Sequence, residues 1–407
     1  MNIPFSLPVI DSDVIDEMND TLTNTGWLTS GPKVLALENE FRKLTTSEVV
    51  ICVNSWVSGA MLMLRWFGVG YGDEVIIPSY TYCATALACL NIGAKPVMID
   101  VLDDFTIDPS KIKAAITSKT KAIIPVDMAG WPCDYDRISE VLNDSGIKKQ
   151  FIPQSLNQEK LGRILVLADA AHSIGASYKG KPVGTVTDVT IFSLHSVKNI
   201  TTGEGGAICL NLPEPFSHSV EYKFIKALSI NGQTKSAFEK NQAGGWKYDI
   251  IAQGLKVNMP DLCATVGLAQ IRKYQSVLLP ERKEIFNFYQ REFSKYIWAI
   301  LPPGETDERI SSFHLFLLRF KEITEEQRDA MIQQISLKGV GVNVHYIPMP
   351  MLTLFKNLGY KMDDYPNTYK LYANEISLPI YNGLTQDQLS RVAIAVIEAY
   401  NSIIQTS

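Results

Sequence analysis

The chain has 407 residues, of which 46% are hydrophobic and 20% are charged, and its formal net charge is −5. This length predicts two domains, and the mildly acidic balance excludes a protein whose main partner is nucleic acid. The six cysteines form no C-x-x-C pair, so we expect no metal site. No apolar stretch is long enough to cross a bilayer, which predicts a cytoplasmic protein without membrane association.

Short apolar runs alternate with helical stretches through the first half of the chain. Residues 33–44 predict a helix, because apolar side chains recur there at helical spacing, and Asp108 followed by Pro109 predicts a further helix start. The apolar runs are continuous rather than alternating, as in strands buried on both faces; they cover residues 74–77, 96–99, 122–126, 164–167, 189–192 and 207–210. This order predicts a large α/β domain with a mostly parallel sheet flanked by helices.

The rest of the chain has a different pattern. Residues 145–162 are polar and interrupted by proline, which predicts a surface insertion, and residues 211–250 predict a long excursion from the sheet. From about residue 265 the sequence predicts a smaller α+β unit, with helices and apolar runs at 268–296, 313–320, 324–337, 339–346 and 385–404. We therefore divide the chain into a large domain with the N-terminal segment, residues 1–265, and a small C-terminal domain, residues 266–407.

One lysine lies in a polar, glycine-rich turn between two of the predicted strands. Residues 192–206 read Phe-Ser-Leu-His-Ser-Val-Lys-Asn-Ile-Thr-Thr-Gly-Glu-Gly-Gly, and the lysine is Lys198. Most lysines are solvated surface charges, and that reading stays open here. A lysine just past a buried strand loses hydration, however, which depresses its pKa and favours a nucleophilic amine. Lys198 is therefore the first candidate catalytic residue.

Three other segments place polar or aromatic groups where strands end or a helix begins. Asp169 follows an apolar strand, where a carboxylate either caps the next element or supports a pyridinium nitrogen. Ser55 opens an apolar helix, which makes either a plain N-cap or a phosphate site. Tyr82 follows another strand and either packs or stacks on a flat ring. A single phosphorylated pyridine cofactor would use all of these groups together with Lys198.

In chain order, these segments resemble the DegT/StrS family of nucleotide-sugar aminotransferases, which have the aspartate-aminotransferase fold (fold type I). The similarity runs from residues 26–32 (Gly-Trp-Leu-Thr-Ser-Gly-Pro) to residues 378–381 (Leu-Pro-Ile-Tyr), and the Thr-Thr-Gly-Glu-Gly-Gly end of the lysine segment is its most specific piece. The resemblance implies a seven-stranded sheet, pyridoxal 5'-phosphate as cofactor with pyridoxamine phosphate as its intermediate form, and a homodimer with shared active sites.

The resemblance also implies roles for single residues. Lys198 would carry the cofactor, Asp169 would hold the pyridine nitrogen, and His172 would lie against the cofactor beside it. The remaining cofactor-binding candidates are Ser55, Trp56, Val57, Tyr82, Ser193 and, from the neighbouring subunit, Asn258. The substrate-binding candidates are Trp27, Thr29, His195, His345 and Tyr346.

The chain departs from the usual family pattern at three places. Trp56 and Val57 stand where glycine or alanine and then threonine are common, so backbone N–H groups or Ser58 must replace the missing threonine hydroxyl. Asp127 and Met128 stand where a histidine and an aromatic residue are common, and Pro350 stands near another usual histidine. The last two departures concern the specificity for the sugar.

The implied reaction is a ping-pong transfer of an amino group from an amino acid, expected to be L-glutamate, to a keto sugar carried on UDP, dTDP or GDP. Residues 26–32 favour C4 of a 4-keto-6-deoxyhexose or related sugar, for glycan or polysaccharide precursors, with C3 of a 3-keto sugar as the alternative. Lys198 argues against the related sugar dehydratases, in which histidine replaces the lysine. Asp169, Lys198 and the glycine turn together argue against a regulatory protein that only binds the cofactor. The glycine cluster at 68–72 follows a helix and precedes a strand, which excludes a dinucleotide-binding motif.

Overall fold

A seven-stranded sheet organises the larger part of the chain. In the computed structural model, which describes residues 2–404, its strand order is β1-β9-β8-β5-β4-β2-β3. The strands are β1 (Val49–Val53), β2 (Glu74–Pro78), β3 (Lys95–Ile99), β4 (Thr120–Ile123), β5 (Leu165–Asp169), β8 (Val189–Ser193) and β9 (Gly206–Leu210). Only β9 runs against its neighbours, since it pairs antiparallel with both β1 and β8. The predicted mostly parallel sheet is therefore confirmed, and β1 is the strand that the apolar runs did not identify.

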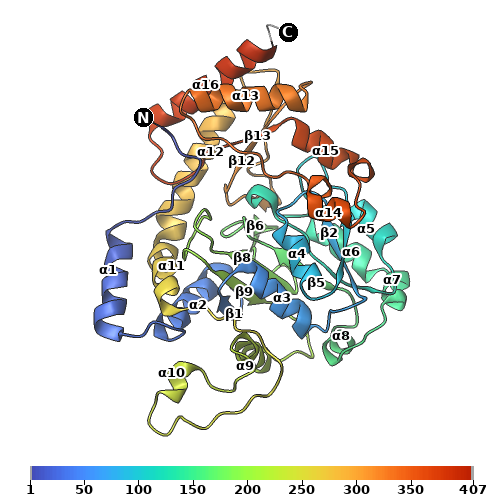
Figure 1. Ribbon diagram of the computed structural model, residues 1–407, viewed down its shortest axis with the longest axis vertical. Helices are drawn as coiled ribbons and strands as arrows, with labels where there is room; N and C mark the ends of the chain where they lie inside the picture. Colours follow the sequence, from blue (N-terminus) through green and yellow to red (C-terminus); the bar gives the residue numbers. More distant parts are fainter. Residues whose placement is uncertain (1, 405–407) are drawn as a thin grey trace.

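Helices cover both faces of this sheet (Figure 1). They are α2 (Pro32–Thr45), α3 (Trp56–Trp66), α4 (Ala84–Leu90), α5 (Pro109–Ala115), α6 (Tyr135–Asn143), α9 (His218–Ser229) and α11 (Asp261–Lys273). One apolar cluster joins the sheet to α3, α4, α5, α6 and α9, and a second joins the opposite face to α2 and α11. Because both faces are buried, the strands are mainly apolar and do not alternate with polar residues, as the sequence pattern indicated.

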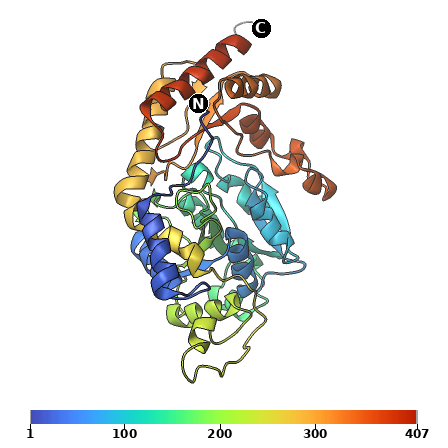
Figure 2. The same cartoon turned by 60° about the vertical axis from the view of Figure 1, so that its left-hand side comes forward.

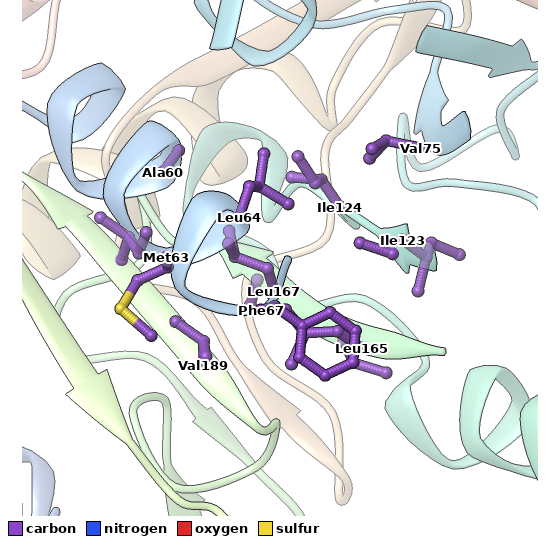
Figure 3. Packing of buried hydrophobic residues seen from close by; sticks show 14 of the residues in the cluster. Ala60, Met63, Leu64, Phe67, Val75, Ile123, Ile124, Leu165, Leu167 and Val189 are labelled. Atoms are coloured by element: carbon purple, nitrogen blue, oxygen red, sulfur yellow. The ribbon is translucent and has the colours of Figure 1, made fainter. Parts of the chain in front are cut away.

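The packing of α3 illustrates how the sheet is held. Figure 3 shows Met63 and Leu64 of α3, with Phe67 directly after the helix, beside Leu167 of β5 and Val189 of β8. Each of these five side chains is almost fully buried. Burying an apolar side chain of this size contributes about 1.5–3 kcal/mol relative to its exposed state. The helix whose N-terminus will matter for function is thus fixed firmly to the centre of the sheet.

A buried carboxylate connects the starts of α2 and α11. Asp261, the first residue of α11, accepts hydrogen bonds from the backbone N–H groups of Gly31 (2.8 Å), Lys33 (3.1 Å) and Val34 (3.0 Å). These N–H groups belong to the first turn of α2, where no carbonyl of the helix itself can reach them. A carboxylate from a distant part of the chain therefore caps α2, and its negative charge interacts favourably with the positive end of the helix dipole.

The two predicted excursions contain helices of their own. Residues 145–162 fold into α7 (Ser145–Gln150) and α8 (Leu156–Leu161), and Ile147 and Phe151 are buried, so this insertion is less superficial than its polar composition suggested. Residues 211–250 contain α9 and α10 (Ala237–Lys240), which lie at one end of the molecule in both views (Figures 1 and 2).

The C-terminal part has a separate sheet and core. Its remaining elements are α12 (Leu279–Phe293), β10 (Ala299–Ile300), β12 (Phe316–Phe320), α13 (Glu325–Leu337), α14 (Thr353–Asn357), α15 (Pro366–Ala373), β13 (Glu375–Leu378) and α16 (Gln386–Ile404). Strands β10, β12 and β13 form an antiparallel sheet, and a third sheet joins β11 (Arg309–Ile310) to β6 (Ser177–Tyr178) and β7 (Lys181–Pro182). A π-helical segment, Tyr274–Leu278, lies between α11 and α12, and residues 339–346 make isolated bridges rather than a strand.

The N-terminal residues pack with this C-terminal part. Ile3 belongs to the core cluster that includes Phe286 and Val396, and it forms a parallel bridge with Val340. Figures 1 and 2 both show the N-terminus beside α16, before the chain runs to α1 (Ser12–Asp20). The division of the chain at residue 265 stays a prediction. No helix within residues 2–404 is long and apolar enough to cross a membrane.

Candidate active site

A cavity of about 470 Å³ lies at the carboxyl ends of β5 and β8 and gathers most of the predicted site residues. Those that line it are Ser55, Trp56, Val57, Tyr82, Asp169, His172, Ser193, His195, Lys198, His345 and Tyr346. They come from both parts of the chain, because the segment with His345 lies beyond the seven-stranded sheet. In an α/β sheet the carboxyl ends of the strands are the usual place for a ligand.

Lys198 is placed by the loop that connects β8 to β9. The loop turns back immediately after β8, and the backbone N–H of Lys198 donates to the carbonyl of His195 (2.9 Å). Burial lowers the pKa of the Lys198 amine to about 8, and the nearby carboxylate of Asp169 opposes this shift. The amine therefore loses its proton more readily than a solvated lysine, and a nucleophile or a proton acceptor needs the neutral form.

Asp169 ends β5 and is almost completely buried. Its carboxylate accepts hydrogen bonds from the hydroxyl of Thr85 (2.9 Å) and from the backbone N–H of Ala171 (3.1 Å). Burial nevertheless raises the pKa of Asp169 to about 7. A cationic group close to a buried carboxyl stabilises its charged form and so lowers its pKa again. A protonated pyridine nitrogen is such a group, as expected for this residue.

The start of α3 forms a cradle with the sheet. The side-chain oxygen of Ser55 caps the helix by accepting a hydrogen bond from the backbone N–H of Ser58 (3.1 Å), and the Ser55 hydroxyl donates to the hydroxyl of Ser58 (2.8 Å). A Cβ on Gly206 would lie 2.8 Å from the carbonyl carbon of Ser55, so only glycine lets β9 approach the helix start this closely. Ser193 pairs with Gly206 across β8 and β9 and lines the same end of the cavity. Helix N–H groups with two hydroxyl side chains suit a phosphate, although Val57 offers no hydroxyl of its own.

His172 is held in one tautomer. The backbone N–H of Ala129 donates to its Nδ1 (3.2 Å), so the ring proton is on Nε2 and points to the hydroxyl of Tyr346 (3.0 Å). Burial and the nearby Lys198 keep the pKa of His172 well below its usual range. The ring of Tyr82 lies 5.5 Å from that of Tyr346, which places the aromatic candidates on one side of the cavity. The site therefore offers a neutral imidazole and flat rings beside Lys198.

Three predicted residues lie outside this cavity. Thr29 and Asn258 border a separate hollow of about 190 Å³, which also has Lys235, Lys240 and Lys256 in its wall. The indole N–H of Trp27 donates to the carbonyl of Ser30 (3.0 Å). Within residues 2–404, Trp27, Thr29 and Asn258 do not line the cavity that contains Lys198.

The unusual residues at 127, 128 and 350 are buried and do not line the cavity. Asp127 accepts hydrogen bonds from the hydroxyls of Tyr135 (2.6 Å) and Ser173 (2.7 Å) and from the backbone N–H of Cys133 (2.9 Å). Burial raises the pKa of Asp127 despite these partners. Its role in this chain is to join the segment after β4 to the segment after β5.

Sequence reasoning missed several residues that line the cavity. They are Phe5, Ser6, Thr81, Ala84, Val126, Ala171, Val197, Glu204, Gly205, His314, Leu315 and Ile380. His314 is the chemically notable one, because its imidazole is buried and its Nδ1 lies 2.8 Å from Oδ1 of Asn199. The available signal was a histidine near the start of the mainly apolar run at 313–320, which also contains Arg319. Within residues 2–404 no group of three or more histidine, cysteine or acidic side chains could hold a metal ion.

Comparison with known proteins gives a consistent picture. Residues 8–150 and 154–397 match the DegT/DnrJ/EryC1/StrS aminotransferase family. The chain is 35% identical to the uncharacterised protein MJ1066 of Methanocaldococcus jannaschii, covering 97% of this chain and 96% of that protein. It is 34% identical to the spore coat polysaccharide biosynthesis protein SpsC of Bacillus subtilis, with the same coverage.

Solved structures include a similar protein with the cofactor bound. Spr1654 of Streptococcus pneumoniae, described as a sugar aminotransferase, superposes in its apo form with a TM-score of 0.94 at 38% identity, over 100% of this chain and 99% of that one. Its pyridoxal-phosphate form gives a TM-score of 0.93 at 38% identity, over 99% and 100% of the two chains. A pyridoxamine-phosphate form has also been solved, so both forms of the expected cofactor occur on this fold.

Proposed function

Because the chain belongs to the DegT/DnrJ/EryC1/StrS aminotransferase family and is a pyridoxal-phosphate-dependent sugar aminotransferase, we propose that it aminates a nucleotide-linked keto sugar, with L-glutamate as the amino donor. The position that it aminates is C4 of a 4-keto-6-deoxyhexose or a related sugar. The observation that carries this proposal is that Lys198, Asp169 and the start of α3 meet in one cavity.

The residues of the chain divide the work of the reaction. Bound pyridoxal phosphate supplies the carbonyl carbon that takes up the amino group and a ring that accepts electrons. Asp169 keeps the ring nitrogen protonated, while the start of α3 and Ser193 hold the phosphate. Lys198 holds the cofactor at rest, and its released amine then removes the α-proton of the amino acid. In the second half-reaction the same amine delivers a proton to the sugar carbon that receives nitrogen.

Two observations support the choice of substrate. Residues 26–32 resemble family members that act at C4, and SpsC, the relative at 34% identity, is named for polysaccharide biosynthesis. We infer that the product of this chain also enters a glycan or polysaccharide precursor. A C3 aminotransferase would use the same cavity and the same lysine, so the position of the new amine is the quantity to measure.

A substrate panel tests this function. The purified enzyme is mixed with pyridoxal phosphate, L-glutamate and 3-keto or 4-keto sugars linked to UDP, dTDP or GDP. We expect an amino sugar, detected by mass, from at least one 4-keto sugar, with 2-oxoglutarate formed in equal amount. Omission of glutamate is the control, and NMR of the product locates the amine. If the enzyme binds the cofactor and no sugar in the panel is aminated, the proposed substrate class is wrong.

We also propose that the working unit is a homodimer. Asn258 lies outside the cavity of its own chain and is partly exposed, so a second subunit can reach it. Its amide N–H donates to the hydroxyl of Ser30 (2.6 Å), which holds the side chain in place. Leu28, Leu35 and Trp246 are about half exposed or more, which suits an interface better than a free surface. In this dimer Asn258 reaches the cofactor phosphate of the partner, and Trp27 and Thr29 border its sugar.

Co-expression of two inactive variants tests the sharing of sites. Lys198→Ala and Asn258→Asp remove groups that, in a shared site, come from different subunits. A mixed dimer then keeps one intact site of two, so an equal mixture should recover about a quarter of the normal activity. The control is a dimer in which both subunits carry Lys198→Ala; this dimer should recover no activity. If Asn258→Asp is fully active by itself, Asn258 has no role in the partner's site.

A further inference from the structure

His314 is held at the cavity by the residue that follows Lys198. Asn199 is buried, and its amide N–H groups donate to the carbonyl of Ser312 (2.9 Å) and to the hydroxyl of Tyr274 (3.1 Å). Its amide oxygen lies 2.8 Å from Nδ1 of His314. One side chain therefore joins the lysine loop to the π-helical segment between α11 and α12 and to the loop before β12.

These contacts determine where the protons are. A carbonyl only accepts hydrogen bonds, so the bond to Ser312 fixes the NH₂ group of Asn199 on that side and its oxygen toward His314. An oxygen at this position requires a proton on Nδ1 of His314. The opposite ring nitrogen, Nε2, then carries a lone pair in the neutral imidazole.

The neutral imidazole is the favoured form of His314. Burial of the ring holds the pKa of His314 well below its usual range, and the cationic or imidazole groups around it act in the same direction; they are His172, Lys198, Arg282 and His345. Arg282 donates to the backbone carbonyl of His314 (2.8 Å) rather than to its ring. No carboxylate among residues 2–404 forms a salt bridge with His314 that would favour a second ring proton.

A histidine that serves only to hold the core together usually has partners for both ring nitrogens. Here Nδ1 is used by Asn199, and this is the only hydrogen bond of the His314 ring within residues 2–404, while the ring lines the cavity that contains Lys198. The free nitrogen is thus an acceptor offered to whatever enters that cavity. An acceptor binds a hydroxyl hydrogen and disfavours a carboxylate or a phosphate.

We propose that Nε2 of His314 accepts a hydrogen bond from a hydroxyl group of the sugar, and that Asn199 is the positioning residue that keeps His314 in this state. The proposal rests on the proposed function, because the sugar supplies the hydroxyl. The amino donor L-glutamate has no hydroxyl: its carboxylates only accept hydrogen bonds and its amino group reacts with the cofactor, so it gains nothing from this nitrogen. His314 therefore acts in one half-reaction and not in the other.

Separate measurement of the two half-reactions tests the role of His314. With the cofactor-loaded enzyme, His314→Phe should lower kcat/KM for the sugar half-reaction about tenfold, the usual effect of losing one neutral hydrogen bond. The glutamate half-reaction, followed by cofactor absorbance, should stay within about twofold of the unmodified enzyme. His314→Gln offers an amide oxygen instead of Nε2 and should recover most of the loss. His218→Phe, at a histidine outside the cavity, is the matched control.

The tautomer of His314 tests the role of Asn199. The chain has five histidines, and His314→Phe assigns the His314 signal in a ¹⁵N-histidine NMR spectrum. We expect a proton on Nδ1 and none on Nε2 in the unmodified protein. Asn199→Asp places a carboxylate on Nδ1 and should protonate Nε2, so the sugar half-reaction slows about tenfold more than the glutamate half-reaction. In the His314→Phe background this extra loss should disappear, because Asn199 acts through His314.

Each contrary result has one meaning. If the unmodified enzyme aminates a keto sugar and His314→Phe slows both half-reactions equally or neither, the inference about His314 is wrong while the proposed function stands. A proton on Nε2 of the unmodified protein overturns the role of Asn199. If no keto sugar is aminated by the unmodified enzyme, the proposed function fails, and the hydroxyl ligand fails with it.

Discussion

Replacement of Lys198 by alanine is expected to abolish transamination, with a loss of at least about 10⁴-fold in both half-reactions. The amine does two kinds of chemistry, since it holds the cofactor covalently and then moves a proton. No other lysine lines the cavity, so no neighbouring amine in the described part of the chain can replace it. The measurement is the rate at which L-glutamate changes the cofactor absorbance of the purified variant.

A control and a chemical label identify the lysine independently of activity. Lys223→Ala, at an exposed lysine of α9, should leave both half-reactions unchanged. Borohydride reduction of the loaded enzyme should attach the pyridoxyl group to the peptide that contains Lys198. The low pKa of about 8 explains why this amine is chosen over solvated lysines near neutral pH. A label on any other lysine would contradict the assignment.

The sequence predicted the parts of the site that local pattern controls. Asp169 and Lys198 were found because each follows a continuous apolar run, and buried parallel strands bring the ends of such runs to one edge of a sheet. Ser55 was found because a hydroxyl before an apolar helical stretch is a helix start. These segments lie close together in space because a parallel α/β sheet brings the carboxyl ends of its strands and the starts of the following helices to one edge.

Residues that reach the cavity through long-range packing had no such signal. His314 precedes β12 in a different sheet, and Phe5 arrives because Ile3 pairs with Val340. The single strand missed in the main sheet, β1, lies between two helices, where a five-residue apolar run is hard to tell from a helical one. The orientation of Asn199 could not be read from sequence either, because it depends on three segments far apart in the chain.

Replacement of Asp169 by asparagine is expected to lower kcat/KM by about 10³-fold, similar to the loss of one strong electrostatic contact to the reacting group. Asparagine keeps the size of the side chain: its amide oxygen can accept from the backbone N–H of Ala171, and its NH₂ group can donate to the hydroxyl of Thr85, so the fold should persist. It cannot carry the negative charge that keeps a pyridine nitrogen protonated. The measurement is the glutamate half-reaction together with the cofactor absorbance spectrum. Normal activity in this variant would exclude Asp169 as the partner of the ring nitrogen.

The same substitution should stabilise the protein when the cofactor has been removed. The pKa of Asp169 is about 7 in the folded protein against 3.8 for the free side chain, so between these values the native state binds more protons than the unfolded state. Stability contributed by this group is therefore present below about pH 4 and is lost as the pH rises toward 7. Lys198, with a pKa of about 8, stays largely protonated over that window. We expect Asp169→Asn to raise Tm of the cofactor-free protein at pH 7.5 and to change it little at pH 4.5. A lower Tm of the variant at pH 7.5 would mean that the charged carboxylate stabilises the cofactor-free fold. The expected higher Tm would mean that Asp169 destabilises the cofactor-free fold, and that the site keeps this charge because the bound ring requires it.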